Sequence, residues 1–174
     1  KNSGLEKRGS GIKGLAQRRN VEVIHGRGNF QDSSTLRVET TDGQKFIRFE
    51  KAIIAVGSKP ALPKVFDLGN PRIMTSTEAL EIEEIPQRLL IIGGGYIGME
   101  MGTVYAALGS EVVVVEAMDS ILAGADPDLV RPVAKLAEKH FKEIRLSTKV
   151  VKMATAGKQI KVVVEKDGKQ AEEL

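Results

Sequence analysis

The chain has 174 residues, of which 41% are hydrophobic and 28% charged, with a formal net charge of +3 at pH 7. This length is enough for a full hydrophobic core. The charges are interspersed, aromatic residues make up only 4%, and Trp is absent, so neither charge nor stacking favours nucleic-acid binding. Without cysteines, this chain cannot form disulfides, thiolate zinc sites or thiol redox centres, and two isolated histidines predict no metal site.

The sequence contains no apolar stretch of the roughly 20 residues that a membrane-spanning helix requires, and no signal-peptide pattern. We therefore expect no membrane association and a cytoplasmic location, or the mitochondrial matrix if the source is eukaryotic. The chain begins at Lys1 without Met and ends at Leu174 in the middle of a pattern. We expect it to be a fragment.

The first sixty residues are predicted to form mainly short strands. A short amphipathic helix is possible over residues 12–19, and the pattern then predicts strands at 21–24, 35–40 and 45–49. Asp42-Gly43 is a strong hairpin signal, so these strands should form a small antiparallel meander. The run KAIIAV at 51–56 predicts a further, buried strand that Gly57 and Ser58 end.

Three prolines bracket the next segment. Pro60, Pro63 and Pro71 predict a connector between domains with little secondary structure. Thr75 and Glu78 have the spacing of a capping box, which predicts a short helix there.

The central stretch changes its hydrophobic period twice. Residues 89–92 predict a buried strand, Gly93-Gly94-Gly95 end it, and the apolar spacing of four, three and four from Ile97 to Leu108 predicts a helix. A second buried strand at 112–115 then ends in Glu116. This order of strand, glycine turn, helix, strand and acidic residue is typical of a dinucleotide-binding unit.

Each glycine of this turn has a separate expected task. Gly93 makes the tight turn, Gly95 leaves room for a pyrophosphate at the backbone, and Gly98 lets the helix approach the sheet. The free N–H groups of the helix start would hold the phosphates. Glu116 would accept hydrogen bonds from the ribose hydroxyls and repel a 2′-phosphate, and no arginine lies between Glu116 and Arg131, so NAD(H) is favoured over NADP(H).

A third strand of the same unit is predicted at 143–146, after a helix that Asp126 caps and Pro127 begins. Pro132 should kink this helix or force a restart. The end of the third strand, at 148–151, falls where an adenine ring would lie. A hairpin around Asp167-Gly168 follows.

The two ends of the chain follow the same order of strand, loop, strand, Asp-Gly turn and strand, which suggests a duplicated nucleotide-binding architecture, truncated at both ends. The fold class expected is α/β, with a Rossmann-like parallel sheet and antiparallel β-meanders, of the FAD/NAD(P)-binding domain type.

GGGYIGMEMG, the following TVYAALGSEVVVVE, the AVGSKP strand end and the approach STEALEIEEIPQRLLIIGGG resemble the flavoprotein pyridine nucleotide-disulfide oxidoreductases, most closely their dihydrolipoamide dehydrogenase branch. The resemblance covers nearly the whole chain. It implies that residues 1–73 are the closing part of an FAD domain and that residues 74–174 are an NAD domain without its last strand.

The resemblance also implies the roles of individual residues. Tyr96 would cover the nicotinamide site, Glu100 would face the junction of nicotinamide and flavin, and Val150 would lie near the adenine. The implied NAD contacts are Gly93, Gly94, Gly95, Tyr96, Ile97, Gly98, Glu100, Glu116 and Val150, and the implied FAD contacts are Gly28, Val56, Gly57 and Ser58.

The family reaction passes electrons from a dihydrolipoyl thiol pair through a disulfide and FAD to NAD. The redox cysteine pair, the first FAD fingerprint and the acid–base histidine of the family have no counterpart here, so this chain would be inactive alone, with no catalytic residue. The intact protein would bind FAD, form a homodimer and act on dihydrolipoyl-bearing acyltransferase subunits of 2-oxoacid dehydrogenase complexes. Two alternatives stay open: another disulfide reductase or NADH oxidase of the family, and a stand-alone nucleotide-binding module without chemistry.

Overall fold

A computed structural model describes residues 2–173. The chain divides into two compact units, one up to Gly57 and one from Ser58 onward.

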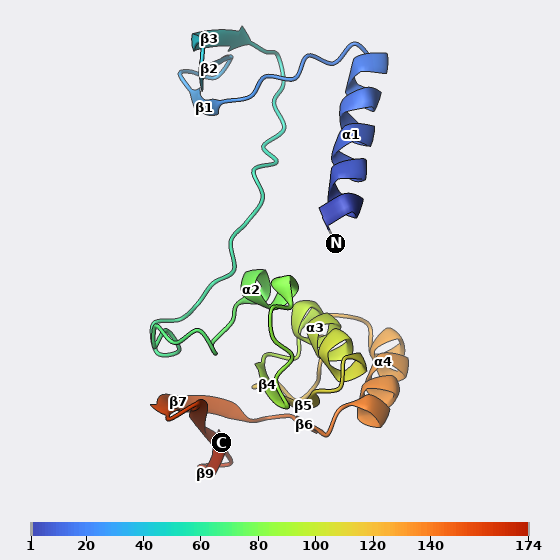
Figure 1. Cartoon of the computed structure of the whole chain (residues 1–174), viewed down its shortest axis with the longest axis vertical. Helices are drawn as coiled ribbons and strands as arrows, with labels where there is room; N and C mark the ends of the chain where they lie inside the picture. The colour runs from blue at the N-terminus through green and yellow to red at the C-terminus, as the bar shows by residue number, and fades with distance from the viewer. Residues whose placement is uncertain (1, 174) are drawn as a thin grey trace. The chain divides into compact units, whose positions relative to one another are not determined.

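The first unit contains one helix and one antiparallel sheet, drawn in blue to teal in Figure 1. Its elements are α1 (Asn2–Arg18), β1 (Arg27–Phe30), β2 (Thr35–Thr40) and β3 (Gly43–Arg48), with the strands in the order β1-β2-β3. Val38 on the central strand is buried, and the rings of Phe30 and Phe49 pack edge to face with centroids 5.7 Å apart. The antiparallel meander is confirmed for the strands predicted at 35–40 and 45–49, whereas its first strand is β1 and not the predicted 21–24.

Two strands predicted in this unit are wrong. Residues 21–24 form no strand, because the chain joins the sheet only at Arg27, which pairs with Glu39. Residues 51–56 are irregular, and Ile53 is 94% exposed. An apolar run indicates burial but does not by itself provide a neighbouring strand, and neither edge of the β1-β2-β3 sheet pairs with this segment. The predicted helix at 12–19 is the end of the longer α1.

Both Asp-Gly hairpins form, but their turns differ. In the second unit Lys166 pairs with Lys169, so Asp167 and Gly168 are the two loop residues, and both have positive φ, 51° and 72°. This is the geometry of a type I′ turn. In the first unit Thr40 pairs with Gly43. The two loop residues there are therefore Thr41 and Asp42, and Gly43 already belongs to the strand.

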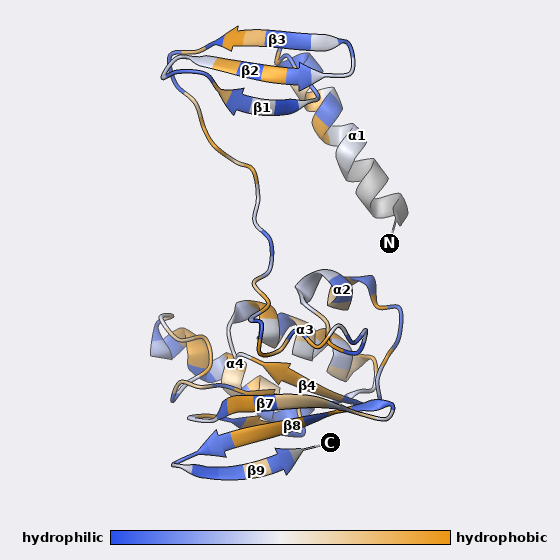
Figure 2. Cartoon of the chain, turned by 90° about the vertical axis from the view of Figure 1, so that its left-hand side faces the viewer, coloured by the Kyte–Doolittle hydropathy of each residue, from blue (hydrophilic) through white to orange (hydrophobic). Residues whose placement is uncertain are grey.

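The second unit consists of three layers. Its elements are α2 (Ser76–Glu81), β4 (Arg88–Ile92), α3 (Tyr96–Ala107), β5 (Glu111–Val115), α4 (Pro127–His140), β6 (Glu143–Arg145), β7 (Lys149–Ala156), β8 (Gln159–Lys166) and β9 (Lys169–Glu173). β4, β5 and β6 form a parallel sheet in that order, and β7, β8 and β9 form an antiparallel one. Figure 2 shows α3 and α4 on one side of β4 and the β7–β9 sheet on the other.

Alternation along β5 explains these layers. Val112 and Val114 are fully buried among residues of α3 and α4, whereas Val115 points the other way and packs with Val162 and Val164 of β8. Successive side chains of a strand point to opposite faces, so a strand that is apolar at every position must be covered on both sides. The continuous valine run of β5 therefore requires the arrangement that is observed.

The helix ends follow the sequence signals. Thr75 and Glu78 form the predicted capping box at the start of α2. Asp126 caps α4 and accepts a hydrogen bond from the Asp128 N–H. Of the kink or restart predicted at Pro132, the restart is wrong, because α4 continues through it, and the kink stays a prediction. The carbonyl that Pro132 leaves without its helical partner belongs to Asp128, in the exposed first turn, where water can bind it.

The α/β fold class, with a parallel sheet and antiparallel sheets, is confirmed. The domain boundary at residue 73 stays a prediction. None of the helices within residues 2–173 has the length and apolar character to cross a membrane. Within the same residues, no group of three or more acidic or histidine side chains is placed to hold a metal ion.

Candidate functional site

The candidate site lies at the carboxyl ends of the three parallel strands. The chain leaves β4 at Gly93, whose N–H still donates to the Val115 carbonyl at 2.8 Å. Glu116 follows β5 and donates its N–H to the Arg145 carbonyl at the end of β6, at 2.9 Å. In open α/β sheets ligands bind at this edge. The tertiary structure thus brings the glycine turn and Glu116 together, as the sequence predicted.

Two glycines of the turn are required by the fold itself. Gly93 has φ +105°, a conformation that is costly for residues with a side chain. A Cβ on Gly98 would overlap the Gly93 carbonyl oxygen and lie 3.2 Å from Ile91 Cγ2. The prediction that Gly98 allows α3 to approach the sheet is therefore supported. Gly102, one turn further, continues the contact, because a Cβ there would lie 2.7 Å from the Phe141 ring.

Gly95 is different, because the space around it is open. A Cβ built at this position meets no other atom within 4 Å, and its φ of −71° suits any residue. Gly95 is the N-cap of α3, and no side chain caps the helix. The amides of Tyr96 and Ile97, in the first turn, have no partner within the helix. Bare N–H groups at the positive end of a helix dipole can bind an anion.

Glu116 points toward the turn. Its Oε2 accepts a hydrogen bond from the Gly94 N–H at 2.6 Å, and its Oε1 accepts one from the Met118 N–H at 2.7 Å. The two bonds fix the plane of the carboxylate. Each carboxylate oxygen can accept more than one hydrogen bond, so lone pairs remain for sugar hydroxyls. The Gly94 N–H is bound to Glu116 and is not among the open amides of the turn.

The sequence reasoning missed two residues of this site. Ile121, only 3% exposed, lies against Gly94, so that a Cβ on Gly94 would be 3.0 Å from Ile121 Cγ2. The Leu122 N–H donates to the Gly94 carbonyl at 2.8 Å. An apolar pair in a loop that contains Asp119, Ser120 and Gly124 was the available signal, but it does not indicate which backbone group the pair contacts.

The other residues predicted to contact NAD or FAD lie in several different elements of the fold. Tyr96 is 69% exposed at the start of α3, and Glu100 is exposed one turn further along that helix. Val150 belongs to β7 and packs against the core cluster that contains Val115, the residue before Glu116. Gly28 lies in β1 and Val56, Gly57 and Ser58 lie in an irregular, exposed segment. Their roles toward FAD stay predictions.

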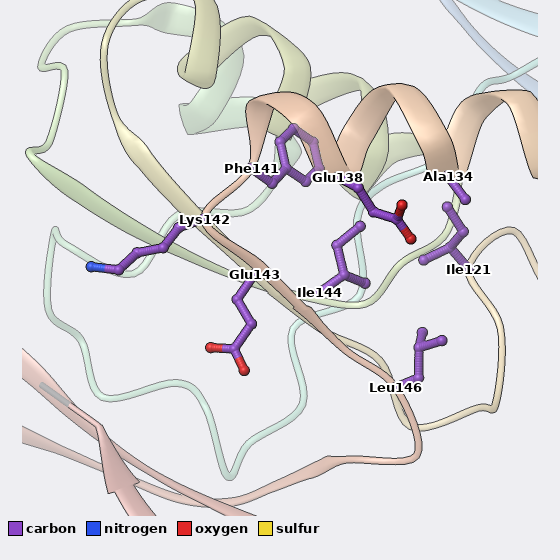
Figure 3. Close-up of a pocket in the computed structure, with 8 residues that line it drawn as sticks. All are labelled: Ile121, Ala134, Glu138, Phe141, Lys142, Glu143, Ile144 and Leu146. Atoms are coloured by element: carbon purple, nitrogen blue, oxygen red, sulfur yellow. The ribbon is translucent and has the colours of Figure 1, made fainter.

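Two hollows of the second unit have linings that contain no residue of the glycine turn. One lies between α4 and β6; in Figure 3 the Glu138 carboxylate lies on the side of Ile121 and Ala134, whereas Lys142 and Glu143 extend on the other side of the view. It is lined by Ile121, Ala134, Glu138, Phe141, Lys142, Glu143, Ile144 and Leu146. A second is bounded by β6, β8 and β9. Gly95 and the first residues of α3 are exposed at this edge, which leaves room for an extended ligand across the strand ends.

Glu143, in β6, has a pKa below its ordinary value of about 4.5, first because Arg145 donates a hydrogen bond to its carboxylate at 2.7 Å. A carboxylate whose pKa is lowered in the folded state stabilises the fold above its unfolded pKa, and this contribution is lost as the pH falls through the folded value. We expect Glu143→Gln to make unfolding less sensitive to acid as the pH falls below the ordinary Glu pKa of about 4.5. Denaturant titrations at several pH values would measure this, and an unchanged acid dependence would contradict it.

The family model of the pyridine nucleotide-disulphide oxidoreductases matches residues 3–173. A dihydrolipoyl dehydrogenase of Haemophilus influenzae is 46% identical over 160 residues, which are 91% of this chain and 33% of the relative. A dihydrolipoyl dehydrogenase of Vibrio parahaemolyticus is 42% identical over 161 residues, 92% of this chain and 33% of the relative. A leghemoglobin reductase of Glycine max is 40% identical over 157 residues, which are 89% of this chain and 30% of the relative.

Solved structures lead to the same family. The HOCl-induced flavoprotein disulfide reductase RclA of Escherichia coli is 30% identical, with a TM-score of 0.72. The alignment covers 95% of this chain and 37% of the RclA chain. LpdA of Mycobacterium tuberculosis, at 22% identity and a TM-score of 0.78 over 96% of this chain and 38% of its own, shares the fold. The chain spans about a third of the length of the curated relatives it matches. The resemblance inferred from the glycine turn and its flanks is confirmed: the chain belongs to the pyridine nucleotide-disulphide oxidoreductase family.

Proposed function

We propose that the chain binds NAD(H) through the glycine turn between β4 and α3. The observation that carries this proposal is the pairing of the uncapped start of α3, with open space at Gly95, and a Glu116 carboxylate oriented by two backbone N–H groups. The amides of Tyr96 and Ile97 would hold the diphosphate, and Glu116 would accept hydrogen bonds from the adenosine ribose.

The residues present fit this cofactor. A diphosphate needs close approach to the backbone, and Gly95 presents no side chain to prevent it. A ribose with free 2′ and 3′ hydroxyls needs acceptors, which a carboxylate supplies, whereas a 2′-phosphate would meet the negative charge of Glu116. These two features support NAD(H) over NADP(H).

In the full-length protein, we propose, this NAD site serves a dihydrolipoyl dehydrogenase, in which FAD passes electrons from a dihydrolipoyl group to NAD. The names of the bacterial relatives support this reaction. Gly28 and residues 56–58 would contact FAD, the protein would be a homodimer, and its partners would be dihydrolipoyl-bearing acyltransferases in the cytoplasm or the mitochondrial matrix. This chain itself would supply the NAD site and none of the redox groups, so it would be inactive alone.

Another family member is the second candidate. It is favoured by the similarity to RclA, a flavoprotein disulfide reductase. The spacing of the redox cysteines in the full reading frame separates the two candidates. A single cysteine, or no pair, would exclude the lipoyl enzyme.

Isothermal titration of the folded chain with NADH and with NADPH tests the proposed site directly. We expect NADH to bind more tightly, because only NADPH brings a phosphate to the Glu116 carboxylate. An equal or greater affinity for NADPH, or a folded chain that binds neither nucleotide, would refute the proposal.

Gly95→Ala separates binding from folding. Because the position is open and its φ is ordinary, the fold should accept the methyl group, and the thermal midpoint should fall by only about 5 °C, the cost of Ala at an N-cap. The methyl group would stand where the diphosphate must approach, so NADH affinity should fall by roughly tenfold or more. Gly11→Ala, which is equally open and lies in α1, is the matched control and should leave NADH affinity unchanged. A Gly95→Ala protein with unchanged affinity would place the diphosphate elsewhere.

A further inference from the structure

The loop that follows β5 is bonded to the glycine turn through its backbone. We call residues 117–125 the brace loop. At its start the Met118 N–H donates to the Glu116 carboxylate, and the Met118 carbonyl accepts a hydrogen bond from the Ser147 N–H at 2.7 Å. The Leu122 N–H donates to the Gly94 carbonyl at 2.8 Å. Both polar groups of Gly94 are therefore occupied by β5 and the residues that follow it, the N–H by Glu116 and the carbonyl by Leu122.

Side-chain packing reinforces these bonds. Ile121 is buried in the core cluster that contains Met99 of α3 and Phe141. A Cβ on Gly94 would lie 3.0 Å from Ile121 Cγ2 and 3.3 Å from Glu116 Cβ, so Gly94 lies closely between these two side chains. Interiors packed at this density transmit displacements, so a shift of Ile121 must move the turn.

The backbone of the brace loop is held in an unfavourable conformation. Leu122 has φ +52°, in the left-handed region that residues with a Cβ rarely adopt. Such a conformation persists only where the surrounding structure determines it. Here it coincides with the hydrogen bond from the Leu122 N–H to Gly94, and with a second turn bond from the Ala125 N–H to the Leu122 carbonyl at 3.0 Å.

We propose that Ile121 and Leu122 are positioning residues for the diphosphate site. By holding the Gly94 peptide from its carbonyl side and from its Cα, they set the direction of the following backbone, from Gly95 to Ile97, whose amides would meet the phosphates. The expected effect of Ile121 and Leu122 on nucleotide binding rests on the proposed NAD(H) site. Their effect on the geometry of the turn does not require a ligand.

Two substitutions at position 121 separate positioning from general stability. Ile121→Val keeps Cγ2, the atom beside Gly94, whereas Ile121→Ala removes it. We expect Ile121→Ala to weaken NADH binding roughly tenfold and Ile121→Val to stay within about twofold of the wild type. Val164→Ala is the matched control, because Val164 is equally buried in the same unit but packs in the other core cluster. It should lower the thermal midpoint without changing NADH affinity.

A second readout uses no nucleotide. The Gly94 N–H is hydrogen-bonded to Glu116, and its exchange with deuterated solvent should be slow in the wild type, faster in Ile121→Ala and unchanged in Val164→Ala. Equal exchange at Gly94 in all three proteins would overturn the proposal, as would equal losses of NADH affinity in Ile121→Ala and Val164→Ala. A wild-type chain that binds no NADH would refute the proposed function alone, because the exchange at Gly94 would still decide the role of the brace loop.

Discussion

Gly98→Ala is expected to lower the free energy of unfolding of the second unit by about 3 kcal/mol, at the upper end of the usual cost of overpacking. The added methyl group would overlap the Gly93 carbonyl oxygen, a backbone atom that cannot rotate away. Either α3 must move off the sheet or the turn must deform. Both displacements carry the amides of the helix start with them, so NADH binding should be lost together with stability.

Thermal unfolding followed by circular dichroism would measure the first effect, and a fall of the midpoint by roughly 10 °C is expected from the size of this unit. Gly102→Ala is the matched control on the same face of α3. Its methyl group would lie 2.7 Å from the Phe141 ring and 3.1 Å from Ile91 Cδ1, which are side-chain atoms that can shift. We expect its effect to be clearly smaller. Equal losses in the two variants would contradict the role assigned to the Gly93 carbonyl.

Glu116→Gln is expected to lower NADH affinity by roughly 10- to 100-fold, because a hydrogen bond to a charged group contributes about 1.5–3 kcal/mol. The substitution keeps the shape of the side chain but leaves only one oxygen. The amide NH₂ would then face the N–H of either Gly94 or Met118, so two donors would meet. One of these N–H groups loses its partner, and Gly94 is buried.

The same change removes the charge that would repel a 2′-phosphate, so the ratio of NADPH to NADH affinity should rise. Glu111→Gln is the control, since Glu111 stands at the other end of β5 and pairs at the surface with Lys142 at 2.6 Å. It should change neither affinity and should alter stability only slightly. If Glu116→Gln left the nucleotide preference unchanged, Glu116 would not be the residue that contacts the ribose.

The dinucleotide unit could be predicted because its signals are local. The four apolar residues before Gly93, the helical spacing after Gly95 and the acidic end at Glu116 lie within a short stretch, and backbone preferences act over that range. Val112 to Val115 also indicated burial on both faces. The same reasoning failed for residues 51–56, where an equally apolar run has no strand beside it within residues 2–173 and stays exposed.

Ile121 and Leu122 could not be found from the sequence, because the contacts that matter join the loop to Gly94, more than twenty residues away, partly through backbone atoms that every residue possesses. Pro132 shows the same limit. The sequence indicates that one helical hydrogen bond is missing, but the exposure of the first turn of α4 decides that the helix continues.

Between Leu89 and Glu116 the elements and the glycine turn follow from the sequence alone, because local sterics and hydrophobic period depend on neighbours in the chain. The use of the Glu116 carboxylate and the contacts that hold Gly94 follow from the assembled fold. These depend on which backbone N–H and carbonyl groups face one another once β4, β5 and the loop after β5 have met at the edge of the sheet.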